Sequence, residues 1–418
     1  MIKIRRSPST ERGTATYEAL LRAGASVFSR RGFRQASVAE ICRRSRVANG
    51  TFYQYFPDKE QIFLTLIERL AYQLQTRLQA SVAPTASAIE QLQSALRTHL
   101  KFIESQTALY RVFREAEFIH TGLSKQLYGQ LARFYQEILQ TGQSQGQLRH
   151  LDPETVSFSL IGMAEFIALR YIFWGRGLPP RVWKTLADLI THGISNQDSS
   201  EFDSSQFDSS DKLKTDELRT VKEQRTRARL LEAAEEEFGQ KGFYEAQIVD
   251  ITRRAGVAHG TFYTYFPSKE AIFVELVREI NTQLRARLRA AIAGLHDRRQ
   301  IERAGFRAFF EFIHKHPKAY RIVREAEFVG SPKNAAGRWY YERFAQGYIP
   351  ALASAIRAGQ LRALDPETLA YALMGVGHFI GVRWVLWEGR AVPDAVFETM
   401  MDFLLHGLLP LDRDRPTS

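Results

Sequence analysis

The sequence predicts an all-α protein made of two successive units of the same kind, and three observations support this prediction. Apolar residues recur at spacings of three and four along long stretches, as at Leu20, Ala23 and Val27, which is typical of amphipathic helices. Glycine and proline fall between these stretches, and no long stretch alternates between apolar and polar residues as a strand would. Finally, long segments of the first half of the chain recur in the second half.

Composition narrows the class of protein. With 418 residues, 44% of them hydrophobic, the chain is long enough for two to four folded domains at roughly 100–200 residues each. The formal net charge of +11 favours a polyanionic partner, either nucleic acid or an anionic membrane surface. The single cysteine, Cys42, fits a reducing cytoplasm. Neither a signal peptide at Met1–Arg6 nor a transmembrane run of about 18 apolar residues is expected, so we predict a cytoplasmic protein that spans no membrane.

The repeat covers most of the chain. Ala48–Leu64 and Ala258–Val274 are identical at 12 of 17 positions, at an offset of 210 residues. Gln147–Thr155 and Gln360–Thr368 are identical at eight of nine positions, at an offset of 213, so the second copy has gained three residues in between. A period this long excludes a solenoid and indicates that a whole unit of about 200 residues was duplicated.

Between the copies lies a segment of different composition, residues 195–216. It is rich in serine and aspartate, and the letters FDSS occur in it twice. A segment of this kind buries too little apolar surface to order itself. We therefore predict a disordered linker between the two copies.

The first copy contains the start signals of a short helix. The preceding helix is expected to end at Gly32, because glycine is a common residue at a helix C-terminus. Ser37 can then cap the next helix, at about Val38–Arg44, and Glu40 completes the S-x-x-E pattern of a capping box.

A second short helix follows after a tight turn. It is expected at about Asn49–Tyr55, it ends before Pro57, and Asp58 caps the long helix that comes next. Phe52 and Phe56 supply its apolar anchoring face. Two short helices joined by a tight turn form a helix-turn-helix, in which the second helix enters the major groove of DNA.

The letters G-T-F-Y-x-Y-F-x-x-K-E occur twice, at Gly50–Glu60 and Gly260–Glu270. With this length and spacing they resemble the DNA-binding domain of the tetracycline-repressor (TetR) family, and the resemblance covers nearly the whole chain except the linker and the ends. It implies a sequence-specific transcriptional regulator, usually a repressor, with three helices for DNA binding and about six for ligand binding and dimerisation in each copy. The implied segments are a DNA-binding domain at residues 1–57, a ligand-binding and pairing domain at 58–194, the linker at 195–216, a second DNA-binding domain at 217–267 and a second ligand-binding and pairing domain at 268–411.

By this resemblance, the third helix of each copy reads bases on double-stranded operator DNA. Asn49 and Gln54 are chemically suited to adenine, whereas His259 is less predictable. The implied base-reading residues are Ala48, Asn49, Thr51 and Gln54 in the first copy and Ala258, His259, Thr261 and Thr264 in the second. The implied contacts to the DNA backbone are Ser37, Tyr53, Tyr55, Lys59, Tyr263, Tyr265 and Lys269. Arg5 and Arg6 form a basic arm that either touches the backbone or the minor groove or remains a solvated tail.

The two predicted reading domains are not equal. Arg46 stands in the turn where the second copy has Gly256, and a positive φ there would strain the arginine by about 1 kcal/mol. Conversely, the second copy has Gln247, a poor cap, where the first copy has serine. Residues 1–60 hold 12 Lys and Arg against 5 Asp and Glu, whereas residues 218–270 hold 9 against 8. The first copy should therefore supply more of the salt-sensitive affinity, and we hypothesise one operator with two unlike half-sites.

The resemblance also implies how the copies pair. The last two helices of each copy would form a four-helix bundle, so that one chain makes an intrachain pseudo-dimer, and a further homodimer of two chains stays possible. Apolar residues crowd these helices, as at Ile161, Phe166 and Phe173, and need a partner surface. The candidate helices are Pro153–Trp174 and Pro180–Ile194 in the first copy and Pro366–Trp387 and Pro393–Leu409 in the second.

The middle helices of each copy should enclose a pocket for a small-molecule effector. The letters R-E-A-E-F occur at Arg114–Phe118 and Arg324–Phe328. These charges either orient a polar group of a ligand or form an internal ion-pair network, since Arg111 and Glu115 stand four residues apart. Nearby aromatic residues either are core or line a site for a hydrophobic or aromatic effector. The candidate ligand-binding residues are Phe102, Tyr110, Phe113, Arg114, Glu117, Tyr128, Phe309, Tyr320, Arg324, Glu327 and Trp339. No cofactor is expected, and no metal either, because His314–His316 is too sparse for a metal site.

Two rival classes of protein are weighed against this prediction. An enzyme is disfavoured because the sequence has no G-x-S-x-G, P-loop, Rossmann or H-E-x-x-H motif. A protein-binding adaptor that has lost DNA binding would not need two intact G-T-F-Y-x-Y-F motifs, and DNA binding in vitro separates the two classes. A regulator in which only one of the two reading helices works is the remaining alternative.

Overall fold

The computed structural model describes residues 10–193, 221–329 and 336–407, and in these residues it contains helices and no β-strand. The expected all-α fold is therefore confirmed. The predicted linker and the basic arm at Arg5 and Arg6 lie outside the described residues. Contacts divide the chain into two compact units, the first running to Trp183 and the second starting at Lys184.

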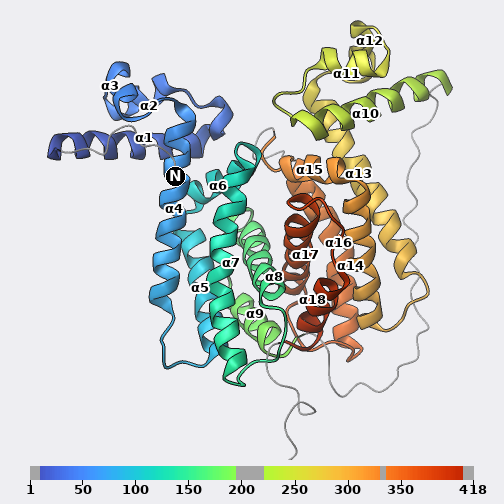
Figure 1. Cartoon of the computed structure of the whole chain (residues 1–418). Helices are drawn as coiled ribbons and strands as arrows, with labels where there is room; N and C mark the ends of the chain where they lie inside the picture. The colour runs from blue at the N-terminus through green and yellow to red at the C-terminus, as the bar shows by residue number, and fades with distance from the viewer. Residues whose placement is uncertain (1–9, 194–220, 330–335, 408–418) are drawn as a thin grey trace, which may run out of the picture. The chain divides into compact units, whose positions relative to one another are not determined.

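In the first copy of the repeat, the first three helices lie together at one end of the long fourth helix (Figure 1). Helices α5 to α8 then pack as a bundle beside α4 and beneath α1. The helices of the first copy of the repeat are α1 (Glu11–Gln35), α2 (Val38–Ser45), α3 (Asn49–Tyr55), α4 (Lys59–Ser81), α5 (Ala88–Ser105), α6 (Thr107–Glu115), α7 (Thr121–Ser144), α8 (Pro153–Ile167) and α9 (Pro180–His192).

The second unit repeats this order of elements. Its helices are α10 (Val221–Lys241), α11 (Ile248–Ala255), α12 (His259–Tyr265), α13 (Lys269–Ile292), α14 (Arg298–Lys315), α15 (Pro317–Glu325), α16 (Ala336–Arg357), α17 (Pro366–Ile380) and α18 (Asp394–His406). In both copies the apolar helix near the end, α8 or α17, continues as a wider π-helical turn, at Ala168–Phe173 and Gly381–Leu386.

The local signals in the sequence place the helix-turn-helix correctly. The Ser37 side chain accepts a hydrogen bond from the Glu40 amide at 3.2 Å and caps α2, and Asp58 accepts one from Gln61 at 2.8 Å and caps α4. The expected capping box is not formed in full, because the Glu40 carboxylate pairs with Arg31 at 2.9 Å instead of returning to the serine amide. Helix α1 breaks its helical geometry at Gly32, where φ is +71°, and then runs on for one short turn.

The turn between the two short helices has the asymmetry that the sequence predicts. Arg46 adopts φ +57°, in the left-handed region, and Gly256 adopts φ +63° at the matching place. Left-handed backbone crowds the Cβ atom, so Arg46 is strained by about 1 kcal/mol and Gly256 is not. Gln247 makes no side-chain hydrogen bond to the start of α11, as its poor capping chemistry suggests.

Among the described residues, two helices are apolar and long enough to cross a membrane, although no such run was expected. They are the extended helices at residues 153–173 and 366–386. Each is 83% buried inside the protein over its most apolar stretch, and each carries an ionisable side chain, Glu165 or His378. Burial of this kind is typical of the core helix of a globular domain.

Most of α9 belongs to the second unit, because that unit starts at Lys184. There the Thr185 hydroxyl accepts a hydrogen bond from the Asp365 amide at 3.1 Å. The C-terminal ends of α9 and α18 meet backbone to backbone at two glycines. A Cβ atom on Gly193 would lie 2.3 Å from the His406 nitrogen, and one on Gly407 would lie 2.5 Å from the nitrogen of His192. This close approach therefore requires glycine at both places.

Candidate DNA interface and effector pocket

Helix α3 has one buried aromatic face and one exposed polar face. Phe52 and Phe56 are 0% and 1% exposed and fix the helix to its domain. The side chains of Ala48, Asn49 and Gln54 are exposed on the opposite face. The helix is thus presented in the way that base reading requires, with its N-terminal end and one polar face open.

Helix α12 has the same pattern of exposure. Phe262 and Phe266 are buried, and Ala258, His259 and Thr264 are exposed. Tyrosines beside these faces are also well placed for DNA. Tyr53 and Tyr263 are 49% and 52% exposed, whereas the remaining predicted contacts on the two helices are half-buried, namely Thr51, Tyr55, Thr261 and Tyr265.

The predicted phosphate contacts Lys59 and Lys269 turn out to bind backbone carbonyls. The ammonium group of Lys59 donates to the carbonyl oxygens of Phe33 at 2.8 Å and Ala36 at 3.0 Å, and Lys269 donates to Ala246 at 2.9 Å. Burial, more than the neighbouring charges, lowers the pKa of both lysines. These bonds tie the start of α4 to the end of α1 and its connection to α2, and the start of α13 to the connection between α10 and α11, which is a structural task.

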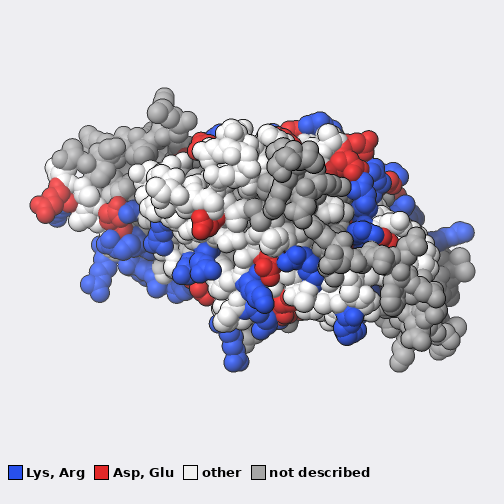
Figure 2. Space-filling model, turned by 90° about the horizontal axis from the view of Figure 1, so that it is seen from below, with Lys and Arg blue, Asp and Glu red and all other residues white. Residues whose placement is uncertain are grey.

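Exposed arginines distinguish the first reading domain from the second. Arg43, Arg44 and Arg46 at the end of α2 are exposed, and no carboxylate among the described residues pairs with them. In the second copy, Arg253 pairs with a carboxylate on its own helix, Asp250, and Arg254 pairs with Glu237 at 2.8 Å. On the face shown in Figure 2, seen from below Figure 1, Lys and Arg side chains gather at the lower left, and basic and acidic side chains mix toward the right.

A buried carboxylate links each reading domain to the bundle beneath it. Glu115 on α6 is 8% exposed, and its two oxygens accept from the Phe33 amide at 3.1 and 3.0 Å, beside the break at Gly32. Glu325 on α15 accepts from the Phe243 amide at 3.0 Å in the same way. Burial raises the pKa of Glu115, and the Phe33 amide and nearby cations partly offset this effect.

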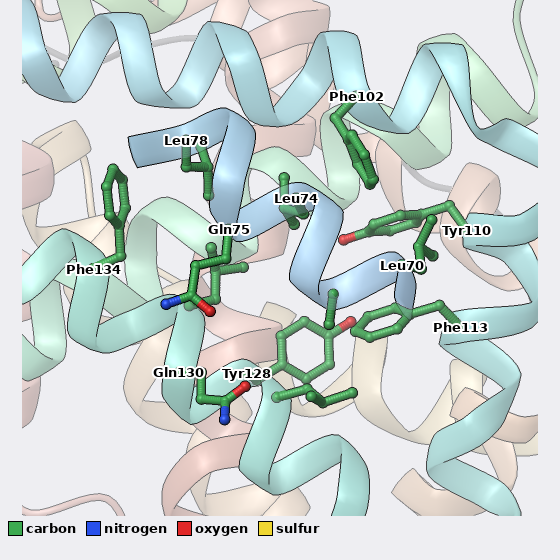
Figure 3. Close-up of a pocket in the computed structure, with 13 residues that line it drawn as sticks. Leu70, Leu74, Gln75, Leu78, Phe102, Tyr110, Phe113, Tyr128, Gln130 and Phe134 are labelled. Carbon is green, nitrogen blue, oxygen red and sulfur yellow. The ribbon is translucent and has the colours of Figure 1, made fainter. Parts of the chain in front are cut away.

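A pocket lies between α4, α5, α6 and α7 of the first unit. In Figure 3 the rings of Tyr110, Phe113 and Tyr128 lie on one side, and Gln75 and Gln130 lie on the other. The pocket is partly open, and the space in it for the centre of a water molecule is about 30 Å³, which is enough to hold water. The lining residues are Leu70, Ala71, Leu74, Gln75, Leu78, Phe102, Tyr110, Phe113, Leu127, Tyr128, Gln130, Leu131 and Phe134.

A fully buried polar cluster closes the inner side of this pocket. Glu165 on α8 is 0% exposed, and its carboxylate accepts from the Tyr110 hydroxyl at 2.5 Å and the Tyr128 hydroxyl at 3.3 Å. The Arg114 guanidinium lies 3.3 Å from the second carboxylate oxygen. Burial, followed by the Glu165 charge, raises the pKa of both tyrosines, so their hydroxyls remain protonated donors.

His99 completes the cluster from α5. Its Nε2 lies 3.3 Å from the Tyr110 oxygen. Because the Tyr110 proton is directed to Glu165, the imidazole must be the donor in this contact, which leaves Nδ1 as an acceptor without a partner among the described residues. Complete burial lowers the pKa of His99 to about 3, so the ring is neutral at physiological pH.

The second copy builds a different cluster on the same tyrosine. Tyr320 shares a hydrogen bond of 2.6 Å with His378 Nδ1, and the ring of Tyr341 meets that histidine edge-on at 6.3 Å. Phe309 packs edge-on against Tyr320 at 5.7 Å. Arg324 is 8% exposed. The carboxylate of the first copy is thus replaced by an imidazole.

The structure brings together only some of the predicted ligand residues. Phe102, Tyr110, Phe113 and Tyr128 line the pocket. Arg114 lies behind it, paired with Glu165, and the Arg111 charge acts on Glu115, so the R-E-A-E-F letters of the first copy belong to an internal network of charges. Glu117 is half-buried in the short turn after α6, and Glu327 is 9% exposed in the second copy. Trp339 is 38% exposed on α16, with the Arg278 guanidinium 5.8 Å from the centre of its ring.

Sequence reasoning missed Glu165 and His378, because it treated their helices only as pairing surfaces. One signal could have found them: each is an ionisable residue in the middle of a largely apolar helix of 21 residues. A buried polar group in such a run needs a partner, and candidates are the arginine of the R-E-A-E-F segment and the tyrosine four residues before it.

Comparison with known proteins agrees with this architecture. The family described as bacterial regulatory proteins, tetR family, matches residues 20–66 and again residues 230–276. The description tetracyclin repressor-like, C-terminal domain, matches residues 85–194. Two matches to one domain in a single chain confirm the duplication that the sequence repeat indicates.

Curated relatives have about half the length of this chain. The uncharacterised HTH-type transcriptional regulator YdgC of Bacillus subtilis is 27% identical over 198 residues, which cover 46% of this chain and 97% of YdgC. The HTH-type transcriptional activator FasR of Mycolicibacterium smegmatis is 34% identical over 110 residues, covering 26% of this chain and 50% of FasR. The transcriptional regulator EthR of Mycobacterium tuberculosis (strain H37Rv) is 28% identical over 184 residues, covering 42% and 82%.

Matches to solved structures also cover less than half of this chain and nearly all of the other chain. The fatty acid degradation regulator FadR of Bacillus halodurans is 19% identical, with a TM-score of 0.40, and the match covers 45% of this chain and 96% of FadR. AibR in complex with isovaleryl coenzyme A and operator DNA is 20% identical, with a TM-score of 0.37, and the match covers 42% and 97%.

Proposed function

Since this chain belongs to the tetracycline-repressor (TetR) family of transcriptional regulators and is not an enzyme, we propose that its two DNA-binding domains read unlike half-sites of one operator. The observation that carries this proposal is the chemistry of the two exposed reading faces. Asn49 and Gln54 on α3 are replaced by His259 and Thr264 on α12, whereas the alanine, threonine and tyrosines around them are the same. Asparagine and glutamine pair well with adenine, and histidine and threonine do not share this preference.

The first domain supplies more of the electrostatic affinity in this proposal. Its exposed arginines Arg43, Arg44 and Arg46 are free of carboxylate partners among the described residues, whereas Arg253 and Arg254 are paired. An arginine without a carboxylate partner neutralises a DNA phosphate and releases a counterion from the DNA. An arginine that is already paired with a carboxylate releases fewer counterions.

We further propose that the protein is a repressor that a hydrophobic or aromatic effector releases from DNA. The pocket of the first unit supports this, since its lining is largely apolar and aromatic. Two elements connect this pocket to the reading domain. Helix α4 lines it with Leu70 and Leu74 and is tied at Lys59 to the end of α1, and α6 lines it with Tyr110 and holds Phe33 through Glu115. A ligand that widens the cavity must therefore shift helices that position α1 to α3.

The two copies pair within one chain in this proposal, and the protein acts in the cytoplasm. Support comes from α9, most of which belongs to the second unit, and from the backbone contact of Gly193 with Leu405 and His406. A unit that contains a helix of the other copy needs no second chain to complete it.

The experiment that tests the DNA-reading proposal is selection of bound sequences from random duplex DNA. The full-length protein is compared with the variants Tyr53→Ala and Tyr263→Ala, which remove one exposed tyrosine from each reading helix. The proposal expects a two-part site with unlike halves, and each variant should weaken selection of one half. Tyr72→Ala serves as the control, because Tyr72 is an equally exposed tyrosine, at 71%, on α4. A single half-site, or a perfect palindrome, would contradict the proposal.

A further inference from the structure

The polar clusters of the two copies occupy equivalent positions of the repeat. Tyr110 and Arg114 correspond to Tyr320 and Arg324 at the offset of 210, and Tyr128 corresponds to Tyr341 at the offset of 213. At that same offset Glu165 corresponds to His378. Three members of the cluster are therefore the same in both copies, and two members change: His99 is replaced by Phe309, and on the apolar helix a carboxylate is replaced by an imidazole.

The shape of the first pocket indicates an elongated apolar ligand. Leu70, Leu74 and Leu78 stand four residues apart on α4 and form one stripe along the pocket. Eight residues of α-helix span about 12 Å, which is the length of an extended chain of about ten carbon atoms. Gln75 lies on the side away from Tyr110, and Gln130 lies next to the ring of Tyr128, so an apolar body can lie between the Tyr110 end and Gln75 (Figure 3).

The charge at the tyrosine end is already balanced. The Glu165 carboxylate holds both tyrosine hydroxyls and the Arg114 guanidinium, and it has no exposure to solvent. An anionic head group arriving there would have to compete with Glu165 for Arg114, and it would place a second negative charge in a buried site. A cationic head group would have to displace Arg114 from Glu165.

An uncharged head group meets no such obstacle. The bond from the Tyr128 hydroxyl to Glu165 is long, at 3.3 Å, so this hydroxyl can turn to an acceptor on the ligand at little cost. Because the pocket is narrow, with about 30 Å³ of space for the centre of a water molecule, a ligand of this length must widen it.

We propose that Glu165 makes the first pocket select elongated apolar molecules with one uncharged hydrogen-bonding head group and reject the matching carboxylates. This inference rests on the proposed effector function of the pocket and names its ligand class. The second copy, which has His378 at the equivalent position, lacks the carboxylate that causes the rejection.

The test measures binding of three ten-carbon probes to the full-length protein by calorimetry, without DNA: decanamide, decanoate and decylamine at pH 7.5. The unmodified protein should bind decanamide at least about tenfold more tightly than either charged probe, a difference of about 1.4 kcal/mol. In Glu165→Gln, and in Glu165→His, which introduces the residue of the second copy, decanoate should gain at least about tenfold relative to decanamide. Glu137→Gln is the control, because it removes an equal charge from the exposed side of α7.

Each other outcome overturns the inference. Equal binding of decanoate and decanamide by the unmodified protein means that Glu165 does not select the head group. Preferred binding of decylamine means that Glu165 receives a cation. Equal weakening of all three probes in both variants means a purely structural role, and no binding of any probe at its solubility limit excludes this ligand class. Since DNA is absent, failure here is distinguishable from failure of the DNA-reading proposal, which sequence selection tests by itself.

Discussion

The two reading domains share one architecture, and they are stabilised and charged differently. In the first domain, the Ser37 side chain caps α2, and Arg46 adopts a strained left-handed conformation in the turn after it. In the second domain, no side chain caps α11, and Gly256 adopts the left-handed conformation without strain. Each domain thus combines one favourable and one unfavourable feature of about 1 kcal/mol. The two copies therefore have the same backbone conformation although different residues stabilise and strain it. Equal geometry at two matching positions does not imply that the residues there have equal roles.

The bundles beneath them show the same contrast in their buried polar groups. The first combines His99, Tyr110 and Glu165, and the second combines Phe309, Tyr320 and His378. Each bundle therefore places one histidine beside the central tyrosine, but from a different helix, α5 in the first copy and α17 in the second. The attachments to the reading domains are the same in both copies, which indicates that divergence concentrated on recognition and spared the connection.

The largest loss of stability is expected for substitutions of the two glycines at which the ends of α9 and α18 meet. Gly193→Ala and Gly407→Ala would each drive a Cβ atom into backbone at 2.3–2.5 Å, and each should destabilise the protein by about 3 kcal/mol or more. Gly146→Ala and Gly359→Ala are matched controls, with φ of +69° and +71° and no atom within 4 Å, and should cost only about 1 kcal/mol. Thermal unfolding followed by circular dichroism measures all four. Equal losses in all four would show that the close backbone contact does not form.

The attachment carboxylates should also be equivalent. Glu115→Ala and Glu325→Ala each leave a buried amide, of Phe33 or Phe243, without its acceptor, which should cost about 1–3 kcal/mol. Hydrogen exchange of those two amides should accelerate in the variant of the same copy and stay unchanged in the other copy. Acceleration in both copies at once would mean that the two reading domains do not open independently.

The two bundles should also differ in how their stability depends on pH, because only the first contains His99. The pKa of His99 is lowered from 6.5 to about 3 by burial, so the unfolded chain binds a proton that the folded chain rejects. Stability is therefore complete above pH 6.5 and falls as the pH decreases toward 3. At pH 5 the loss is about 2 kcal/mol, from 1.4 kcal/mol per pH unit over about 1.5 units.

His99→Phe introduces the residue that the second copy has at this position and should remove that pH-dependent loss. Unfolding midpoints of the variant and the unmodified protein at pH 7.5 and pH 5 measure the effect, and His150→Gln, at an exposed histidine, is the control. If the midpoint of the unmodified protein falls no more steeply than that of the variant, His99 is not buried in its neutral form.

The smallest effect concerns the turn of the reading domain. Arg46→Gly should stabilise the protein by about 1 kcal/mol, because glycine adopts φ +57° without strain, and Gly256→Arg should destabilise it by a similar amount. Denaturant midpoints of the two variants give the comparison. Changes of the same sign in both would show that the turns are not equivalent.

Features that depend on nearby residues could be predicted from the sequence. The bounds of α3 and the caps at Ser37 and Asp58 follow from residues within four positions, and the strain at Arg46 follows from comparison with its repeat. The remaining features depend on distant parts of the chain. The acceptors of Lys59 lie 23 to 26 residues away, and the partner of Glu115 lies 82 residues away, so neither role is visible in a local pattern.

The candidate pocket shows the same division. Four aromatic residues that line it, Phe102, Tyr110, Phe113 and Tyr128, were among the predicted ligand-binding residues, whereas Phe134 was not. The leucine stripe of α4 was missed because Leu70, Leu74 and Leu78 look like ordinary core positions. Glu165 was missed because its helix was assigned to pairing alone, and only the fold brings it to Tyr110, which is 55 residues away.

The most direct measurement makes the two reading faces identical. In the double variant His259→Asn with Thr264→Gln, the exposed base-reading positions of α12 match those of α3. Sequence selection with the unmodified protein should return a site with two unlike halves, and selection with the double variant should return a palindrome of the half-site that α3 reads. An unmodified protein that already selects a palindrome, or a double variant that selects the unmodified site, would contradict the proposal that the two helices read one operator with different specificities.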